Sequence, residues 1–152
     1  MERIAVFPGS FDPITKGHES IVKRAIPLFD KIIIAIGTNS SKKYMFDLAQ
    51  RKLWLENTFK NSPNIEVIDY SGLTVEFCKE QNANFILRGL RSYSDFDYEF
   101  GIAQMNKSLV NNVETVFLLT EPEYSAISST IVRDIIRNNG KVEQFLPNAV
   151  TL

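Results

Sequence analysis

The sequence predicts an α/β fold: a single domain, residues 1–152, in which helices flank a doubly wound, Rossmann-like sheet of five parallel strands. Two observations support this class. Short runs rich in β-branched and aromatic residues alternate with longer stretches of helical periodicity, and the length suits one domain. Several short runs are almost wholly apolar, which is typical of strands that helices cover on both faces of a parallel sheet.

The individual elements follow from local composition. Five runs favour strands: Ile4–Phe7, Ile32–Ile36, Ile65–Tyr70, Phe85–Leu87 and Val113–Leu119. Five stretches place apolar residues at helical spacing: His18–Leu28, Asp47–Phe59, Thr74–Gln81, Asp95–Leu109 and a last one from about Ser129 to Asn139. Because ligands bind beyond the carboxyl ends of parallel strands, we expect a site in the loops that follow the strands.

The composition excludes several functions. With 17 basic and 18 acidic side chains the net charge is −1, which argues against nucleic-acid or membrane-surface partners. One cysteine, Cys78, and one histidine, His18, cannot make an internal disulfide or a structural zinc site. The lone cysteine favours a reducing compartment, and no signal or membrane-spanning segment is visible. We therefore expect a cytoplasmic protein.

The loop after the first strand, Pro8 to His18, contains two prolines and two glycines and leads into a helix. A helix start offers unpaired N–H groups and the positive end of the helix dipole, and phosphate is a natural ligand there. The loop is neither a Walker loop nor a dinucleotide fingerprint. The alternative is that Thr15 or Gly17 simply caps the helix, with His18 an incidental residue of its first turn.

Two further loops supply cations. Lys42 and Lys43 end the loop after the second strand, where they are either a solvated turn or phosphate ligands. Arg88 and Arg91 follow the fourth strand, and arginine suits bidentate contact with phosphate. Ion pairing is the structural alternative, which we expect to hold for one arginine rather than both, with partners among Asp95, Asp97 and Glu99.

The last loop brings three hydroxyl groups, Ser128, Ser129 and Thr130, to a helix start. One side-chain oxygen is enough for an N-cap, so the others predict a second anion-binding helix terminus facing the first. Together the loops supply the groups needed to bind a triphosphate. They lack the carboxylate clusters of a metal cage or a glycosidase, so no protein-bound metal is expected.

Four ordered motifs carry a resemblance to a known family. Thr15-Lys16-Gly17-His18 and Ile127-Ser128-Ser129-Thr130-x-x-Arg133 resemble the two signatures of the nucleotidyltransferase α/β phosphodiesterase superfamily. The motifs P-G-S-F-D-P-I-T-x-G-H, N-x-x-K-K, L-R-G-L-R-x-x-x-D-F-x-Y-E and F-L-P-x-x-V are similar to those of the bacterial phosphopantetheine adenylyltransferase family.

The resemblance implies adenylyl transfer from ATP to 4′-phosphopantetheine, giving dephospho-coenzyme A and pyrophosphate, the penultimate step of coenzyme A biosynthesis. It also implies direct in-line attack without a covalent enzyme intermediate, Mg²⁺ bound mainly through substrate phosphates, and a homohexamer. It assigns catalytic roles to His18, Lys42 and Arg91, and phosphopantetheine contacts to Ser10, Lys42, Thr74 and Arg88. The ATP contacts that it assigns are Ser10, Phe11, His18, Gly89, Leu90, Arg91, Glu99, Tyr124, Ser125, Ala126, Ile127, Ser128, Ser129 and Thr130.

The chain departs from the family pattern in two places. Ser10 stands where many relatives carry threonine, a change that keeps the hydroxyl and loses a methyl group. The sequence ends at Leu152, where relatives commonly continue into a closing helix; this departure bears on terminal packing and subunit contacts and not on the chemistry. Three other functions are weighed: a nucleotidyltransferase with another acceptor, such as nicotinamide mononucleotide or glycerol phosphate; a non-catalytic nucleotide-binding module on the same scaffold; and, least favoured, a receiver-type signalling domain.

Overall fold

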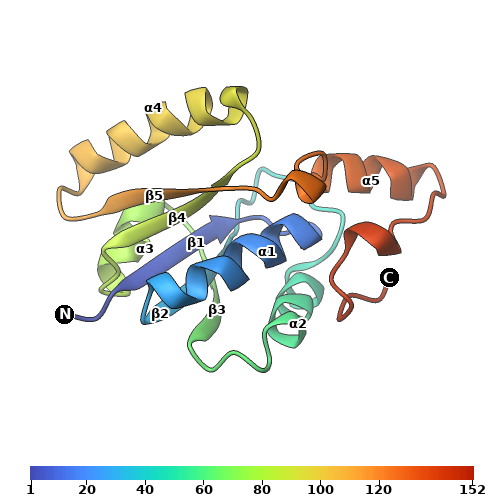
Figure 1. The fold of residues 1–152 in the computed structure, drawn as a ribbon, viewed down its shortest axis with the longest axis horizontal. Helices are drawn as coiled ribbons and strands as arrows, with labels where there is room; N and C mark the ends of the chain where they lie inside the picture. Colours follow the sequence, from blue (N-terminus) through green and yellow to red (C-terminus); the bar gives the residue numbers. More distant parts are fainter.

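A computed structural model describes residues 1–152 and contains the predicted parallel sheet (Figure 1). Its strands are β1 (Ile4–Gly9), β2 (Lys31–Gly37), β3 (Ile65–Tyr70), β4 (Phe85–Leu90) and β5 (Glu114–Leu119). All neighbouring strands are parallel, and their order is β3-β2-β1-β4-β5. The chain winds outward in one direction from β1 and in the other from β4. The gap between these two strands is therefore the topological switch point, where ligands bind in doubly wound sheets.

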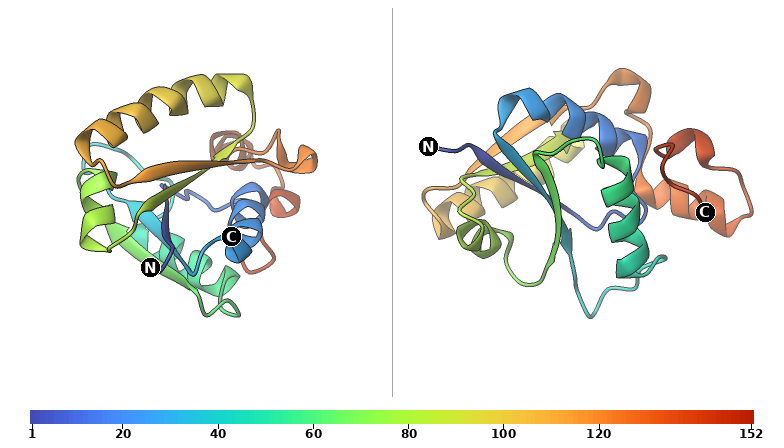
Figure 2. Two further views of the ribbon diagram at one scale, coloured as in Figure 1. Left: turned by 60° about the vertical axis from the view of Figure 1, so that its left-hand side comes forward. Right: turned by 90° about the horizontal axis from the view of Figure 1, so that it is seen from below.

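Helices cover both faces of the sheet, as the apolar strands predict, while the last helix lies beyond the carboxyl ends of the strands (Figure 1 and Figure 2). They are α1 (Lys16–Ala25), α2 (Leu48–Thr58), α3 (Thr74–Glu80), α4 (Tyr93–Leu109) and α5 (Ser129–Arg137). The larger core cluster joins one sheet face to α1 and α2, for example through Val22 and Leu55. The second cluster joins the other face to α3, and Cys78 is buried in it. Burial raises the pKa of this thiol to about 12, so Cys78 contributes packing and not thiolate chemistry.

Two element boundaries differ from the prediction in ways that affect the site. Strand β4 continues past Leu87 to Leu90, because Arg88 and Gly89 pair in register with β5. The two residues therefore lie at the end of a strand and not in a loop. Helix α4 begins at Tyr93, ahead of the predicted start, because the Ser92 side chain accepts a hydrogen bond from the backbone N–H of Asp95 and caps the helix.

Helix α4 contributes little to the core. Its only buried residue is Glu99, while Phe96, Phe100 and Leu109, which the helical spacing placed on an apolar face, are exposed in the single chain. Phe96 contacts the rings of Phe100 and Phe117, and the outer side of the helix stays apolar. None of the helices is both long enough and apolar enough to cross a membrane.

Candidate active site

Two adjoining cavities, of about 310 and 300 Å³, open at the carboxyl ends of β1 and β4. They share Pro8 and Gly9 on β1, Arg88 on β4 and Glu99 on α4. We call the first the Lys42 cavity, since its wall includes Ser10, Lys42 and Thr74. We call the second the Arg91 cavity, since its wall includes His18, Arg91 and the start of α5. A site of this shape can hold two ligands that meet at the shared wall.

The Lys42 cavity collects all four residues assigned to phosphopantetheine, Ser10, Lys42, Thr74 and Arg88, from four different strand ends. The Lys42 ammonium donates to the Ser10 hydroxyl at 3.2 Å. Thr74 begins α3, and its hydroxyl lies 2.8 Å from the hydroxyl of Tyr70 at the end of β3. The polar groups on this wall are therefore placed around one small volume.

The Arg91 cavity is lined by two helix N-termini, as the sequence predicts. Thr15 is the N-cap of α1, and Ser128 is the N-cap of α5, where its side chain accepts from the backbone N–H of Ile131 at 3.1 Å. Capping accounts for one of the three hydroxyls at the start of α5. Ser129 donates its hydroxyl to the carbonyl of Pro13 at 2.8 Å, which ties α5 to the loop after β1. Both positive helix ends thus face the same cavity, an arrangement that favours an anion.

His18 is both a helix-capping residue and part of the cavity wall. Its Nδ1 atom accepts from the backbone N–H of Thr15 at 3.0 Å, which completes a capping box at the start of α1. The alternative in which Thr15 caps the helix is thus correct, but His18 is not incidental to it. Since a backbone N–H can only donate, Nδ1 carries no proton, and the neutral ring is protonated at Nε2.

The environment of His18 keeps the ring uncharged. Burial, and then the positive charges of Arg88 and Arg91, lower its pKa from 6.5 to about 4. The ring also packs edge-on against Phe11, with the ring centroids 5.1 Å apart. At neutral pH, His18 is therefore a fixed neutral donor at the wall of the Arg91 cavity.

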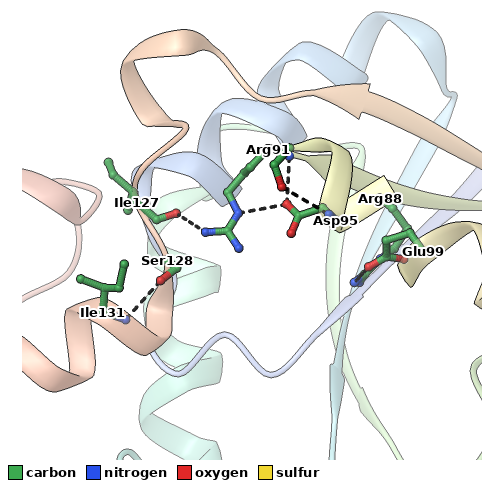
Figure 3. Close-up of polar contacts among 8 residues, drawn as sticks. Arg88, Arg91, Asp95, Glu99, Ile127, Ser128 and Ile131 are labelled. Carbon is green, nitrogen blue, oxygen red and sulfur yellow. Dashed lines mark hydrogen bonds and ion pairs between the residues drawn. The ribbon is translucent and has the colours of Figure 1, made fainter. Parts of the chain in front are cut away.

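Both arginines form ion pairs, which corrects the expectation that only one would (Figure 3). Arg88 donates from two nitrogens to the two carboxylate oxygens of Glu99, at 3.0 and 2.5 Å, and from a third to the carbonyl of Pro8 at 2.7 Å. Arg91 pairs with Asp95 at 3.3 Å. The reason is helical spacing: Asp95 and Glu99 are four residues apart on α4, so one helix face offers a carboxylate to each arginine.

Arg91 also joins the two sides of its cavity. Its Nη1 atom donates to the carbonyl of Ile127, in the segment before α5, at 3.3 Å, while the Asp95 carboxylate accepts from the Arg91 backbone N–H at 3.0 Å (Figure 3). The guanidinium therefore bridges the end of β4 and the start of α5. Both residues that this bridge joins, Arg91 and Ile127, line the Arg91 cavity.

Some residues assigned to ATP lie on the wall and others do not. Besides those already placed, Gly89, Glu99, Tyr124, Ile127 and Thr130 line the Arg91 cavity. Phe11 and Leu90 are buried, Ser125 donates its hydroxyl to the carbonyl of Pro122, and Ala126 lies outside the wall. A side chain on Gly89 would meet Ile21 of α1 at 3.0 Å. This glycine therefore permits close packing of α1 against β4.

Sequence reasoning missed several residues of the site. Tyr70 and Asn106 line the Lys42 cavity. Tyr70 ends β3, so the rule that sites form at the carboxyl ends of strands could have identified it. Asp12 and Arg51 lie behind the cavities and are nearly fully buried. Nothing in the local sequence indicates that Arg51, at one position of a helix, reaches the loop after β1.

No group of three or more His, Cys, Asp or Glu side chains is placed to hold a metal ion. The polar groups at the two cavities are mainly cationic side chains, hydroxyls and helix N-termini. The two carboxylates on the cavity walls, Asp95 and Glu99, pair with arginines. This donor set fits a Mg²⁺ ion that arrives on substrate phosphates and keeps several water ligands.

Comparison with known proteins agrees with this geometry. A family model described as cytidylyltransferase-like matches residues 6–135, which defines the class: an α/β nucleotidyltransferase. A relative from Flavobacterium johnsoniae is 57% identical over 148 residues, covering 97% of both chains. Relatives from Leptospira biflexa and Clostridium perfringens are 47% and 44% identical, over 99% and 97% of this chain and 94% and 90% of their own. All three are named phosphopantetheine adenylyltransferase. The chain belongs to the phosphopantetheine adenylyltransferase family.

Proposed function

We infer that this chain transfers the adenylyl group of ATP to 4′-phosphopantetheine, releasing pyrophosphate and giving dephospho-coenzyme A in the penultimate step of coenzyme A biosynthesis. The observation that carries this inference is the pair of adjoining cavities that share Arg88 and Gly9. One cavity contains the whole residue set assigned to phosphopantetheine, and the other contains most of the set assigned to ATP. Two substrates bound in this way meet at the shared wall.

The reaction needs no covalent enzyme intermediate. An oxygen of the 4′-phosphate attacks the α-phosphorus of ATP, and the bond from that phosphorus to the β-phosphate oxygen breaks. The work of the protein is to align the groups and to place donors where negative charge develops. We assign that work to His18, Lys42 and Arg91. His18 lines the Arg91 cavity and Lys42 lines the Lys42 cavity. In this proposal both donate to the reacting phosphates, and Arg91 binds the triphosphate near the start of α5.

Mg²⁺ is part of this proposal as a partner of ATP. When bound, it neutralises charge on the phosphate oxygens, and it is held by those oxygens and water. We also propose that the chain works in the cytoplasm and assembles into a homohexamer. The exposed apolar side chains of α4, such as Tyr98 and Met105, which are 71% and 65% exposed, support self-association. A sizing measurement in solution tests the number of subunits.

Pyrophosphate release tests the function. ATP with phosphopantetheine should give pyrophosphate and dephospho-coenzyme A, while nicotinamide mononucleotide and glycerol phosphate as acceptors should give none. His18→Ala should lower kcat by roughly 10²–10³, the cost of losing one fixed donor, with a far smaller change in ATP affinity. Tight ATP binding without turnover on any acceptor would instead indicate a nucleotide-binding module. If His18→Ala lost ATP affinity and turnover equally, His18 would not be a group that stabilises the transition state.

A further inference from the structure

Two buried charged residues lie behind the site, and neither belongs to an ion pair. Asp12, in the loop after β1, is 4% exposed, and Arg51, on α2, is 2% exposed. The nine ion pairs of the structure do not include them. Burying an unpaired charge costs several kcal/mol unless hydrogen bonds compensate, so their bonds show what they hold in place.

Both residues bind backbone groups, and they join the same two loops. The two carboxylate oxygens of Asp12 accept from the backbone N–H groups of Met45 and Phe46, at 2.8 and 2.9 Å. Arg51 donates in the other direction, from Nη1 to the carbonyl of Ser10 at 2.8 Å and from Nε to the carbonyl of Phe46 at 3.0 Å. We call residues 38–47 the Lys42 loop. Two hydrogen bonds to Asp12 therefore join the Lys42 loop directly to the loop after β1, and Arg51 bridges the two loops with one bond to each.

Arg51 also contacts a side chain of the Lys42 loop. Its guanidinium stacks on the ring of Tyr44, 4.1 Å from the ring centroid. The Tyr44 hydroxyl donates to the carbonyl of Gly37, at the end of β2, at 3.2 Å. The tip of the loop, in contrast, has one long-range side-chain contact, the 3.2 Å bond between Lys42 and Ser10. The position of the Lys42 ammonium in the cavity thus depends on how the base of its loop is held.

We propose that Asp12 and Arg51 are positioning residues of the adenylyl transfer: they fix the Lys42 loop so that the Lys42 ammonium stands beside Ser10 in the Lys42 cavity. The proposal rests on the proposed function. Neither residue lines either of the two cavities, so their effect on turnover passes through Lys42 and Ser10. A displacement of about 1 Å in a positioned group can cost on the order of 10²-fold in rate.

The kinetic test uses Arg51→Lys, which keeps the charge but has one donor nitrogen in place of the two, Nε and Nη1, that reach the carbonyls of Phe46 and Ser10. It should lower kcat at least tenfold and raise KM for phosphopantetheine, with KM for ATP changed less than twofold. Lys52→Gln is the matched control, because Lys52 is the next residue of α2 and pairs on the surface with Asp69. It should keep the wild-type kcat.

A double variant separates positioning from a general structural role. In the Lys42→Ala background, Arg51→Lys should lower kcat less than threefold further, because the group that it positions is gone. Losses that multiply in the double variant would overturn the proposal. So would wild-type kcat in both Arg51→Lys and Asp12→Asn.

Amide hydrogen exchange tests the same loop without substrate, so it does not depend on the proposed function. In Asp12→Asn, which keeps the side-chain shape, exchange at Met45 and Phe46 should be at least tenfold faster than in the wild type. Exchange at β2 should be unchanged. Unchanged exchange at both amides would show that Asp12 does not fix the Lys42 loop, and this result would overturn the proposal even if Arg51→Lys failed to fold. If the wild-type enzyme released no pyrophosphate, the proposed function would fail. The exchange measurement would still show whether Asp12 holds the Lys42 loop in place.

Discussion

The two cavities hold their cations in different ways. Lys42 extends from an exposed loop, its ammonium contacts the Ser10 hydroxyl, and it forms no ion pair, while the loop beneath it is fixed through backbone groups. Arg88 and Arg91 rise from a strand end, and each is held directly by a carboxylate of α4. A phosphate that reaches Lys42 competes with no carboxylate, because Lys42 contacts only the Ser10 hydroxyl. One that reaches the arginines must compete with Glu99 or Asp95.

The carboxylates themselves differ in burial, and this sets what each can do. The Glu99 side chain is 10% exposed and accepts from Arg88 through both oxygens. The Asp95 side chain is 29% exposed, and only one of its oxygens accepts from Arg91. Buried, bidentate pairs are costly to break, whereas exposed pairs contribute little. We therefore expect Glu99 to be a permanent support of Arg88, and Asp95 to be a partner that an anion can displace.

Glu99→Gln should produce the largest effect on stability. The amide has only one oxygen to accept from Arg88 and leaves the half-buried guanidinium without a counter-charge, so the free energy of unfolding should fall by about 2–3 kcal/mol. Denaturant unfolding measures it. Asp95→Asn is the control in the same experiment, with an expected loss below about 1 kcal/mol. Equal losses in the two variants would show that the difference in burial does not change what the two ion pairs contribute to the free energy of unfolding.

The pH dependence of stability should be the next largest effect. The pKa of His18 is about 4 in the folded chain and 6.5 as its ordinary value, so the unfolded chain binds more protons between these limits. Stability should therefore fall as the pH is lowered through this window, by roughly 1–2 kcal/mol between about pH 7 and pH 5. His18→Asn should lack this contribution.

Because His18 is the only histidine of the chain, its pKa can be measured directly. An NMR titration of the ring should give one pKa far below 6.5, with the proton on Nε2 throughout the neutral range. A value near 6.5 would mean that the ring is solvated and that the arginines do not act on it. Adding ATP should raise the value, because the phosphates offset the charge of Arg88 and Arg91.

Much of the fold could be predicted from the sequence, because strand and helix periods are local. The strands from Ile4, Ile32 and Ile65 begin at or within a residue of their predicted positions. The strand order and the extension of β4 to Leu90 could not be predicted, since they depend on pairing with β5, which lies far along the chain. The helical spacing of α4 could not decide whether Phe96 and Phe100 pack in a core or across subunits. In the single chain both are exposed, and the one buried residue of the helix is charged.

The residues of the site likewise include some that the sequence could predict and some that it could not. Ser10, His18, Lys42, Arg88 and Arg91 were predicted because each lies at or soon after a strand end, where position in the chain fixes position at the sheet edge. The groups that hold them were not predicted. Asp12 and Arg51 are 39 positions apart in the sequence, and each binds backbone that only the fold brings near. The second ion pair was missed although Asp95 and Glu99 were both named as partners, since the decisive fact is that one helix face carries both.

Asp95→Asn gives the smallest expected effect and the finest test of the comparison. Without the carboxylate, Arg91 no longer has a competing anion, so ATP and pyrophosphate should bind about two- to fivefold more tightly at low salt. The gain should shrink between about 0.05 M and 0.5 M salt, because exposed charges are screened. Asp97→Asn removes the same charge two residues along α4, where Asp97 is exposed and forms no ion pair. Calorimetric titration of both variants should show the tighter binding in Asp95→Asn alone. Equal gains would mean that the net charge of the helix, and not the Asp95–Arg91 pair, tunes the anion site.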